Sequence, residues 1–235
     1  MTKGVLTSRL LERAGVRHGF TTRRLGDALA DLSGWEQATS LQPGNLVRLK
    51  QVHGNEVLTV DAPASELPPE EERRFDAAVT RRNDVILSVR TADCVPILLF
   101  APGVVAAAHA GWRGTVSGTL KNTVEAMVEL RECRADSILA VMGPCIRSCC
   151  YQVGRDVWEP FTQRFRRDAV IDRDDGRYVD LIAANRAWLL RSGVHPENID
   201  VLNACTHCSP EMFFSYRREG STGRQLAFIT LGEAK

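Results

Sequence analysis

Two short apolar runs in the middle of the chain predict a pair of buried strands. Residues 95–100 (Val-Pro-Ile-Leu-Leu-Phe) and 104–108 (Val-Val-Ala-Ala-Ala) flank a Pro102-Gly103 turn. Continuous apolar runs of this length, bounded by turn residues, are typical of strands buried on both faces. We therefore expect the turn to fold the two runs back on each other as an antiparallel pair.

Five polar or reactive residues gather at one end of this expected pair. Cys94 precedes the first run and His109 follows the second, so antiparallel pairing brings the two together at one end of a sheet. Arg90 and Asp93 are close to Cys94 in the sequence and Arg113 is close to His109, so all three are expected at the same end of the sheet. Charges this close to buried strands need a partner or a function. This end of the sheet is therefore the first candidate for a functional site.

The pattern also predicts short strands on both sides of the central pair. Residues 46–52 alternate between apolar and polar positions, and Gly54-Asn55 then suits a tight hairpin turn into a strand at 56–60. This places His53 at a strand end beside a turn. Further strands are expected at 17–22, 75–79, 85–89, 137–142, 199–202 and 225–231.

Helical periodicity marks three segments of the chain, at 115–130, 154–165 and 180–192. Thr115 and Asp180 are the expected N-caps of the first and third helices, and Gly193 follows the third as a stop signal. The chain has no internal repeat and no Pro/Gly-rich linker. We expect a single domain over residues 1–235, in the α/β (mixed α+β) class.

Composition narrows the classes of function. The 235 residues are 44% hydrophobic and 25% charged with a net charge of +1, so neither nucleic acid nor a membrane surface is an expected partner. No apolar run approaches the roughly 18 residues of a membrane span, and the N-terminus lacks the pattern of a signal peptide. Seven cysteines, an odd number, argue against a disulfide scaffold. We expect reduced thiols in a cytoplasmic protein.

His53, Cys94 and His109 form the first candidate constellation, because each is expected at a strand end beside a turn. Two imidazoles and one thiolate suit zinc, and three protein ligands leave a fourth position open for water or substrate. The same residues also suit a metal-free thiol hydrolase with Cys94 as nucleophile and His109 as base. A third interpretation is that they are unrelated residues in turns.

The remaining cysteines offer a second, weaker candidate. Cys205-Thr-His-Cys208 has the spacing of half a structural zinc site or of a redox pair. The other half would come from Cys145, Cys149 and Cys150. The alternative is a turn with buried thiols, and the sequence does not decide whether a second metal binds here.

Three arginines and two aromatic residues are candidates for binding a substrate. Arg23, Arg90 and Arg113 can hold a phosphate or carboxylate through the planar guanidinium, while Phe214 and Tyr216 can stack on a ring. The alternative is a set of solvated surface residues. The chain contains neither Gly-x-Gly-x-x-Gly nor a Walker A motif, so no phosphate-binding glycine loop is expected.

Five motifs, in order along the chain, resemble the YfiH-type laccase-domain family, which is also called the multicopper polyphenol oxidoreductase family. The resemblance runs from about residue 18 to residue 229. The motifs are Lys50-Gln-Val-His-Gly54, Thr91-Ala-Asp-Cys-Val-Pro96, Ala108-His-Ala-Gly-Trp-Arg-Gly114, Gly143-Pro-Cys-Ile146 and Phe213-Phe-Ser-Tyr-Arg-Arg218.

The resemblance implies a CNF-toxin/YfiH-like fold with mixed β-sheets sandwiched by helices. It implies a metal, usually zinc and alternatively copper, held by the residues that match His53, Cys94 and His109. The implied activity is phosphorolysis of purine nucleosides (adenosine, inosine, guanosine or methylthioadenosine) with inorganic phosphate, together with adenosine deamination. We expect a monomer or small homo-oligomer.

Three alternatives to this activity stay open. One is the metal-free Cys-His hydrolase. Another is copper-dependent oxidation of phenols, the older interpretation of the family, which fits poorly because a multicopper centre needs many imidazoles and this chain has only five histidines. The last is a non-enzymatic metal-binding or cell-wall fidelity factor.

Overall fold

The fold consists of two mixed β-sheets and a small hairpin, in a computed structural model that describes residues 4–30 and 32–232. The five-stranded sheet has the order β1-β2-β13-β6-β3 and the six-stranded sheet the order β12-β9-β7-β8-β5-β4. The strands of the first are β1 (Val5–Leu6), β2 (Arg17–Thr21), β3 (Leu46–Val47), β6 (Ile86–Thr91) and β13 (Gln225–Thr230). Those of the second are β4 (Val57–Val60), β5 (Ala77–Thr80), β7 (Val95–Ala101), β8 (Val104–Ala110), β9 (Leu139–Met142) and β12 (Ile199–Val201). The hairpin is formed by β10 (Val170–Arg173) and β11 (Gly176–Val179).

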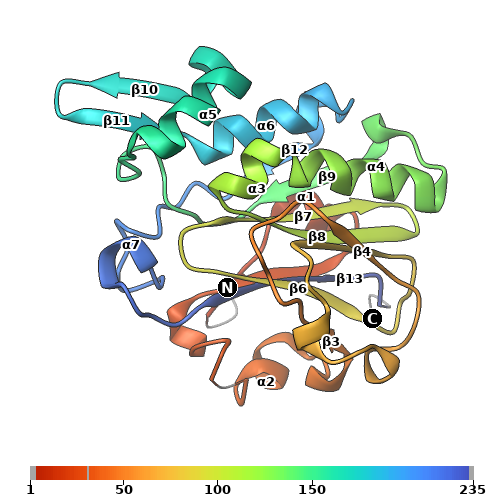
Figure 1. Cartoon of the computed structure of the whole chain (residues 1–235). Coiled ribbons are helices and arrows are strands. Elements are labelled where there is room, and N and C mark those ends of the chain that lie inside the picture. The colour runs from red at the N-terminus through yellow and green to blue at the C-terminus, as the bar shows by residue number, and fades with distance from the viewer. Residues whose placement is uncertain (1–3, 31, 233–235) are drawn as a thin grey trace.

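Both faces of the central strands are buried, which explains their continuous apolar runs. On β7, Ile97 and Leu99 belong to the core beneath the helices, whereas Leu98 between them belongs to the core between the two sheets. On β6, Leu87 and Val89 complete that inter-sheet core from the other side. The two sheets therefore pack face to face, as Figure 1 shows.

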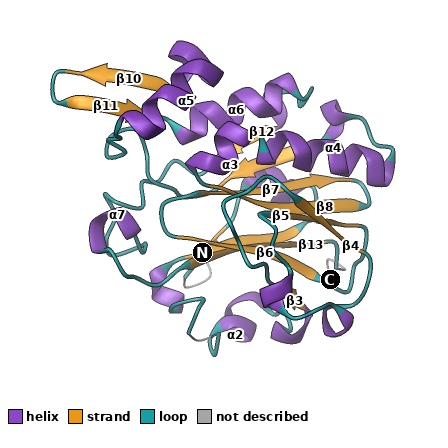
Figure 2. Cartoon of the chain, in the orientation of Figure 1, coloured by secondary structure: helices purple, strands orange, loops and turns teal. Residues whose placement is uncertain are grey.

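Helices cover the outer face of the six-stranded sheet (Figure 2). They are α3 (Trp112–Ser117), α4 (Thr119–Arg131), α5 (Arg155–Phe165) and α6 (Leu181–Arg191). On the outer side of the five-stranded sheet, α2 (Trp35–Thr39) places Trp35 against Phe228 of β13, with ring centroids 4.6 Å apart. The short helices α1 (Arg9–Arg13) and α7 (Tyr216–Glu219) complete the set. This mixed α+β arrangement confirms the expected sheets sandwiched by helices.

Several predicted elements are confirmed. β7 and β8 pair antiparallel with Pro96 opposite His109, so the residues that flank the two runs do meet at one end of the sheet. Asp180 caps α6, because its side chain accepts a hydrogen bond from the N–H of Ala183 at 3.0 Å. Among the described residues, no helix is long and apolar enough to cross a membrane.

The predicted hairpin at Gly54-Asn55 is wrong. The first strand ends at Val47, and β4 pairs in parallel with β5 in the other sheet. The segment between them leaves the sheet because its backbone N–H groups bind the carboxylate of Asp76 instead of a neighbouring strand.

The predicted helix at 115–130 is two helices. Gly118, with a φ of 90°, separates α3 from α4, and glycine adopts this left-handed conformation without steric cost. Thr115 is not an N-cap, because α3 already begins at Trp112. The Thr115 hydroxyl is buried and accepts a hydrogen bond from Asn185 of α6.

Candidate metal and substrate site

The structure brings His53, Cys94 and His109 together. One ligand atom of each lies within 4.8 Å of the others, and the two imidazole rings meet edge to face with centroids 5.0 Å apart. His109 lies on β8, Cys94 directly precedes β7, and His53 lies in the loop between β3 and β4. The ends of two strands of the six-stranded sheet and the loop that connects the two sheets therefore converge on one point, at the end of the sheet that the apolar runs indicated.

Two residues of this site have an uncommon backbone conformation. His53 has a φ of 61° and Asp93 a φ of 102°, a region that residues other than glycine seldom occupy. Such strain persists where the surroundings hold it in place, and it concentrates at functional sites. At Asp93 the surroundings are the Thr206 hydroxyl, 2.6 Å from one carboxylate oxygen, and the Arg217 backbone N–H, 2.7 Å from the other.

Asp76 is the residue that organises the site. Its side chain is fully buried and accepts the backbone N–H groups of Val52, His53 and Gly54 at 2.7–3.1 Å. It also lies 2.7 Å from Nδ1 of His109. This contact leaves Nε2 of His109 as the atom that can bind a metal, the usual arrangement when a carboxylate orients a metal-binding histidine.

Gly111 leaves room for the three donors. A Cβ atom at this position would lie 3.0 Å from Sγ of Cys94 and 3.0 Å from Cδ2 of His53. Any larger residue would press the two ligands apart. The residues present therefore fit a small ion, both in the chemistry of the donors and in the space between them.

The electrostatics of the site favour a thiolate. Burial raises the pKa of the Cys94 thiol, but the charge of His109 and hydrogen bonds from both histidines outweigh burial and bring the pKa down to about 6. Burial lowers the pKa of His109, while Cys94 and Asp76 raise it to about 9. A thiolate is both the metal-binding and the nucleophilic form of cysteine, so this chemistry suits either a metal centre or a thiol hydrolase.

The three donors lie at the wall of a cavity of about 680 Å³. Its lining is rich in cations and aromatic rings: Lys50, Arg90, Arg113, Arg217 and Arg224 line it together with Trp112, Tyr151 and Tyr216, and Asp93 is its only carboxylate among the described residues. An anion and a flat ring are the ligands that such a lining would favour.

The predicted substrate-binding residues do not all lie at this cavity. Arg90, Arg113 and Tyr216 line it, whereas Arg23 and Phe214 do not. The guanidinium of Arg23 stacks on the Phe214 ring at 4.6 Å and donates a hydrogen bond to Glu219 at 3.1 Å.

The cavity arginines differ in how far their charge is compensated. Arg90 forms an ion pair with Glu70 and also donates to the Leu49 carbonyl. Within the described part of the chain, Arg113 has no carboxylate partner, and its guanidinium rests on the Trp112 ring at 4.3 Å. Arg113 is therefore the better placed of the two to meet an anion.

Sequence reasoning gave no role to several residues of the site, among them Asp76, Gly111, Tyr151 and Arg224. Only Asp76 carried a signal that could have found it. It is a lone carboxylate at the start of the apolar run at 75–79, and a buried charge requires partners.

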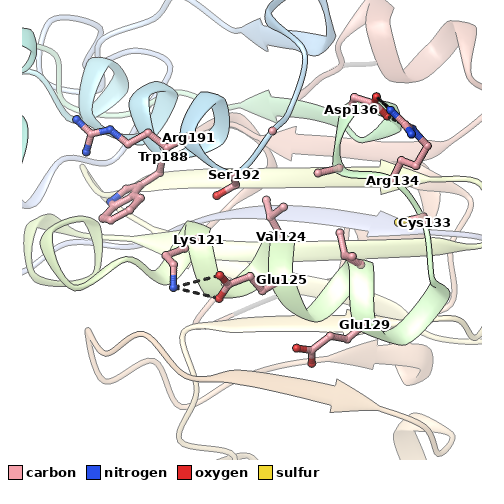
Figure 3. Close-up of a pocket in the computed structure, with 13 residues that line it drawn as sticks. Lys121, Val124, Glu125, Glu129, Cys133, Arg134, Asp136, Trp188, Arg191 and Ser192 are labelled. Carbon is pink, nitrogen blue, oxygen red and sulfur yellow. Dashed lines mark hydrogen bonds and ion pairs between the residues drawn. The ribbon is translucent and has the colours of Figure 1, made fainter.

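A larger cavity of about 780 Å³ lies between α4 and α6 (Figure 3). Four of its charged residues form ion pairs within the lining, Lys121 with Glu125 and Arg134 with Asp136. Neither group of metal-binding side chains found among the described residues lies there. Of the two cavities, only the smaller one is lined by a group of side chains that could hold a metal among the described residues.

Known proteins resemble this chain over most of its length. Residues 27–232 match the family described as multi-copper polyphenol oxidoreductase laccase. "Adenosine deaminase RL5", from an unknown prokaryotic organism, is 39% identical over 79% of this chain and 74% of that protein. "Purine nucleoside phosphorylase" of Deinococcus radiodurans is 37% identical over 92% of this chain and 89% of that protein.

A solved structure agrees with these sequence comparisons. The Bacillus licheniformis hypothetical protein YfiH superimposes with a TM-score of 0.88 at 28% identity, over 97% of both chains. The motifs around the three donors indicated the same family. The chain belongs to the multi-copper polyphenol oxidoreductase laccase family.

Proposed function

We propose that this chain is a zinc-dependent purine nucleoside phosphorylase that also deaminates adenosine at the same site. The observation that carries the proposal is the placement of His53, Cys94 and His109 at the wall of a cavity lined by five cations. The names of the relatives in Deinococcus radiodurans and of RL5 support these two reactions. Phosphorolysis needs an anion site next to a place for a nucleoside, and the cavity lining suits both.

Zinc is the metal that the donor set favours, since two imidazoles and one thiolate with an open fourth position are typical of catalytic zinc. His53, Cys94 and His109 would hold it. When bound, zinc would act as a Lewis acid that polarises a substrate group or a water molecule.

The protein's own residues would bind and orient the two substrates. Arg113, which has no carboxylate partner among the described residues, would hold the phosphate beside the anomeric carbon of the nucleoside. Tyr216, 62% exposed at the cavity, would stack on the purine. Asp76 would keep the Nδ1 proton of His109 in place, so that His109 presents Nε2 to the metal throughout the reaction.

Metal analysis and turnover test the proposal together. We expect the purified protein to contain zinc and to release hypoxanthine from inosine only when phosphate is present, and to release ammonia from adenosine without phosphate. Cys94→Ala should lose both activities. Cys133→Ala, which removes a thiol bound to the Met127 carbonyl, should keep them. Zinc-loaded protein that consumes neither nucleoside would refute the proposal.

The phosphate site has its own test. Arg113→Ala should raise the KM for phosphate about ten- to a hundredfold, the value of a hydrogen bond to a charged group. Arg82→Ala, which removes an exposed guanidinium paired with Asp84, is the matched control and should leave this KM unchanged. Arg23→Ala tests the sequence prediction for that residue. We expect its effect to be much smaller than that of Arg113→Ala, because Arg23 lies outside the cavity lining.

A metal-free thiol hydrolase is the second candidate, favoured by the low pKa of Cys94 beside His109. The two candidates differ in their response to metal removal. A chelator that strips the metal should abolish phosphorolysis, whereas a hydrolase would keep or gain activity and be inactivated by alkylation of Cys94. Oxidation by a multicopper centre is disfavoured, because such a centre needs many imidazoles. Outside the first site, the ring of His18 already forms hydrogen bonds with the Ser8 N–H and the Val16 carbonyl and offers no free nitrogen to a metal.

A further inference from the structure

A second group of metal-binding side chains lies outside the proposed catalytic site. Cys149 and Cys150, in the loop after β9, meet Cys205 and Cys208, in the loop after β12. We propose that these four cysteines, Cys149, Cys150, Cys205 and Cys208, bind a zinc ion whose role is structural. The proposal is independent of the nucleoside activity.

The geometry of the four thiols carries the proposal. Their Sγ atoms all lie within 4.8 Å of one another, with Cys150 and Cys208 3.2 Å apart and Cys149 and Cys208 3.7 Å apart. Zinc bound tetrahedrally by four thiolates at about 2.3 Å places its sulfur atoms about 3.8 Å from each other. The thiols therefore already surround a volume of the size that zinc requires.

The chemistry of the donors selects the class of metal. Four soft thiolates favour zinc over magnesium or calcium, and a complete set of four protein ligands leaves no position open for a substrate. Binding would replace four thiol protons with one Zn²⁺ and release the protons to solvent, without any change of oxidation state.

A disulfide explains the arrangement less well. All four cysteines are free thiols, and the 3.2 Å between Sγ of Cys150 and Sγ of Cys208 is well beyond a covalent bond of about 2.0 Å. A single disulfide would also involve only two of the four neighbouring thiols and would leave the position of the other two unexplained. Three cysteines lie outside the group: Cys94 belongs to the first site, and Cys133 and Cys145 belong to neither site. Cys133 donates to the Met127 carbonyl, and Cys145 is fully buried in the core.

The backbone around the four cysteines is already ordered as a site. The Arg147 N–H donates to Sγ of Cys205 at 3.5 Å, a contact that stabilises a thiolate. Residues 145 and 205 pair as a parallel β-bridge, and the Thr206 N–H donates to the Cys145 carbonyl at 3.0 Å. The two loops are thus held side by side before any ion binds.

The position of the group indicates what the ion would hold in place. Tyr151, which directly follows Cys150, lines the cavity of the first site. Thr206, inside the Cys205–Cys208 turn, donates a hydrogen bond to Asp93 next to Cys94. A zinc ion at the four cysteines would therefore fasten the loop that carries Tyr151, which lines the cavity, to the loop whose Thr206 holds Asp93.

Metal counting in a variant that lacks the first site tests the proposal. His109→Ala removes one ligand of the first site and leaves the four cysteines intact. We expect the purified His109→Ala protein to retain about one zinc per chain by mass spectrometry of metals. Adding Cys208→Ser should remove it. Adding Cys133→Ser, the matched control, should not.

Two further measurements keep the result interpretable. Cys208→His in the same background should retain the zinc, because histidine is an equivalent ligand and Cys208 is exposed enough to accept it; this separates loss of a ligand from loss of the fold. Cobalt(II) bound to the His109→Ala protein should show the intense thiolate-to-metal absorption of a four-sulfur site. The proposal is overturned if His109→Ala binds no zinc, if the Cys208→Ser addition retains it, or if alkylation and mass spectrometry find a disulfide between Cys150 and Cys208 in place of the metal.

Discussion

The two groups of side chains that could hold a metal, the His53, Cys94 and His109 group and the four-cysteine group, are built on different parts of the fold. The first places two imidazoles and one thiol at the end of buried strands, with His109 only 3% exposed and a fully buried Asp76 behind it. The second places four thiols on two surface loops, where Cys149 and Cys208 are exposed. Three donors beside a cavity leave room for a substrate, whereas four donors close the coordination of a metal.

The two proposed roles call for different structural surroundings. A site that must hold a reacting group gains from a rigid strand scaffold and a buried carboxylate that fixes the ligand orientation. A site that fastens loops needs only that its ligands reach one another. The variants below separate the two roles, in order of expected effect.

The largest effect concerns stability at the four-cysteine group. Cys150→Ser should lower the melting temperature by on the order of 10 °C, because a ligand present at a thousand times its Kd stabilises the native state by about 4 kcal/mol. Its kcat for nucleoside phosphorolysis should change only a few-fold. Scanning calorimetry at fixed free zinc measures the first quantity. A variant with normal stability but no turnover would reverse the roles assigned to the two groups.

The next effect concerns the carboxylate behind the first site. Asp76→Asn should weaken zinc binding at His53, Cys94 and His109 and lower kcat/KM by about ten- to a hundredfold. The amide places N–H donors against the backbone N–H groups that Asp76 now accepts. Competition with a chromophoric chelator measures the affinity. The exposed Asp84→Asn is the matched control, and an equal loss in both variants would remove Asp76 from its assigned role.

A smaller effect is expected from one added methyl group. Gly111→Ala should lower activity about tenfold, because its Cβ would lie 3.0 Å from both Cys94 and His53 and displace them by a few tenths of an ångström. Gly44→Ala meets no atom within 4 Å and is the control. The four-cysteine group should keep its zinc in both variants. Full activity of Gly111→Ala would show that the ligands tolerate the shift.

The smallest expected effect is on the pH dependence of stability, to which two buried histidines contribute differently. Asp76 and Cys94 raise the pKa of His109, whereas burial lowers the pKa of His18 below 6.5. Between the lowered pKa of His18 and 6.5, the unfolded chain binds more protons than the folded one, so His18 reduces stability as pH falls below 6.5. Between pH 7.5 and 5.5, His18→Asn should therefore lose less free energy of unfolding than the wild type. The exposed His195→Asn should follow the wild type.

Much of the fold could be predicted from local patterns. The runs at 95–100 and 104–108 became β7 and β8 because continuous apolar residues must be buried on both faces, and the turn between them fixes their pairing. Asp180 caps its helix because a carboxylate at the N-cap position accepts a hydrogen bond from a free N–H group of the first turn. Such features depend on neighbours in the sequence.

The predictions that were wrong concern segments whose structure is set by residues distant in the sequence. Residues 46–52 have the alternation of a strand, yet Asp76, some twenty residues later, binds the N–H groups of residues 52–54 and draws this part of the chain toward the site. Arg23 and Arg113 look alike in sequence, yet only Arg113 lines the cavity, because Glu219 and Phe214 hold Arg23 elsewhere.

The sequence by itself determined the buried strands, two of the three large helices and the identity of the residues able to bind a metal. Those follow from hydrophobic periodicity, capping and side-chain chemistry, which act locally. Only the tertiary structure decided which of these residues meet: that Asp76 stands behind His109, that Gly111 leaves space for the ligands, and that Cys149 and Cys150 face Cys205 and Cys208. Contacts between residues far apart in the chain are set by the packing of whole sheets and loops, and no short stretch of sequence carries that information.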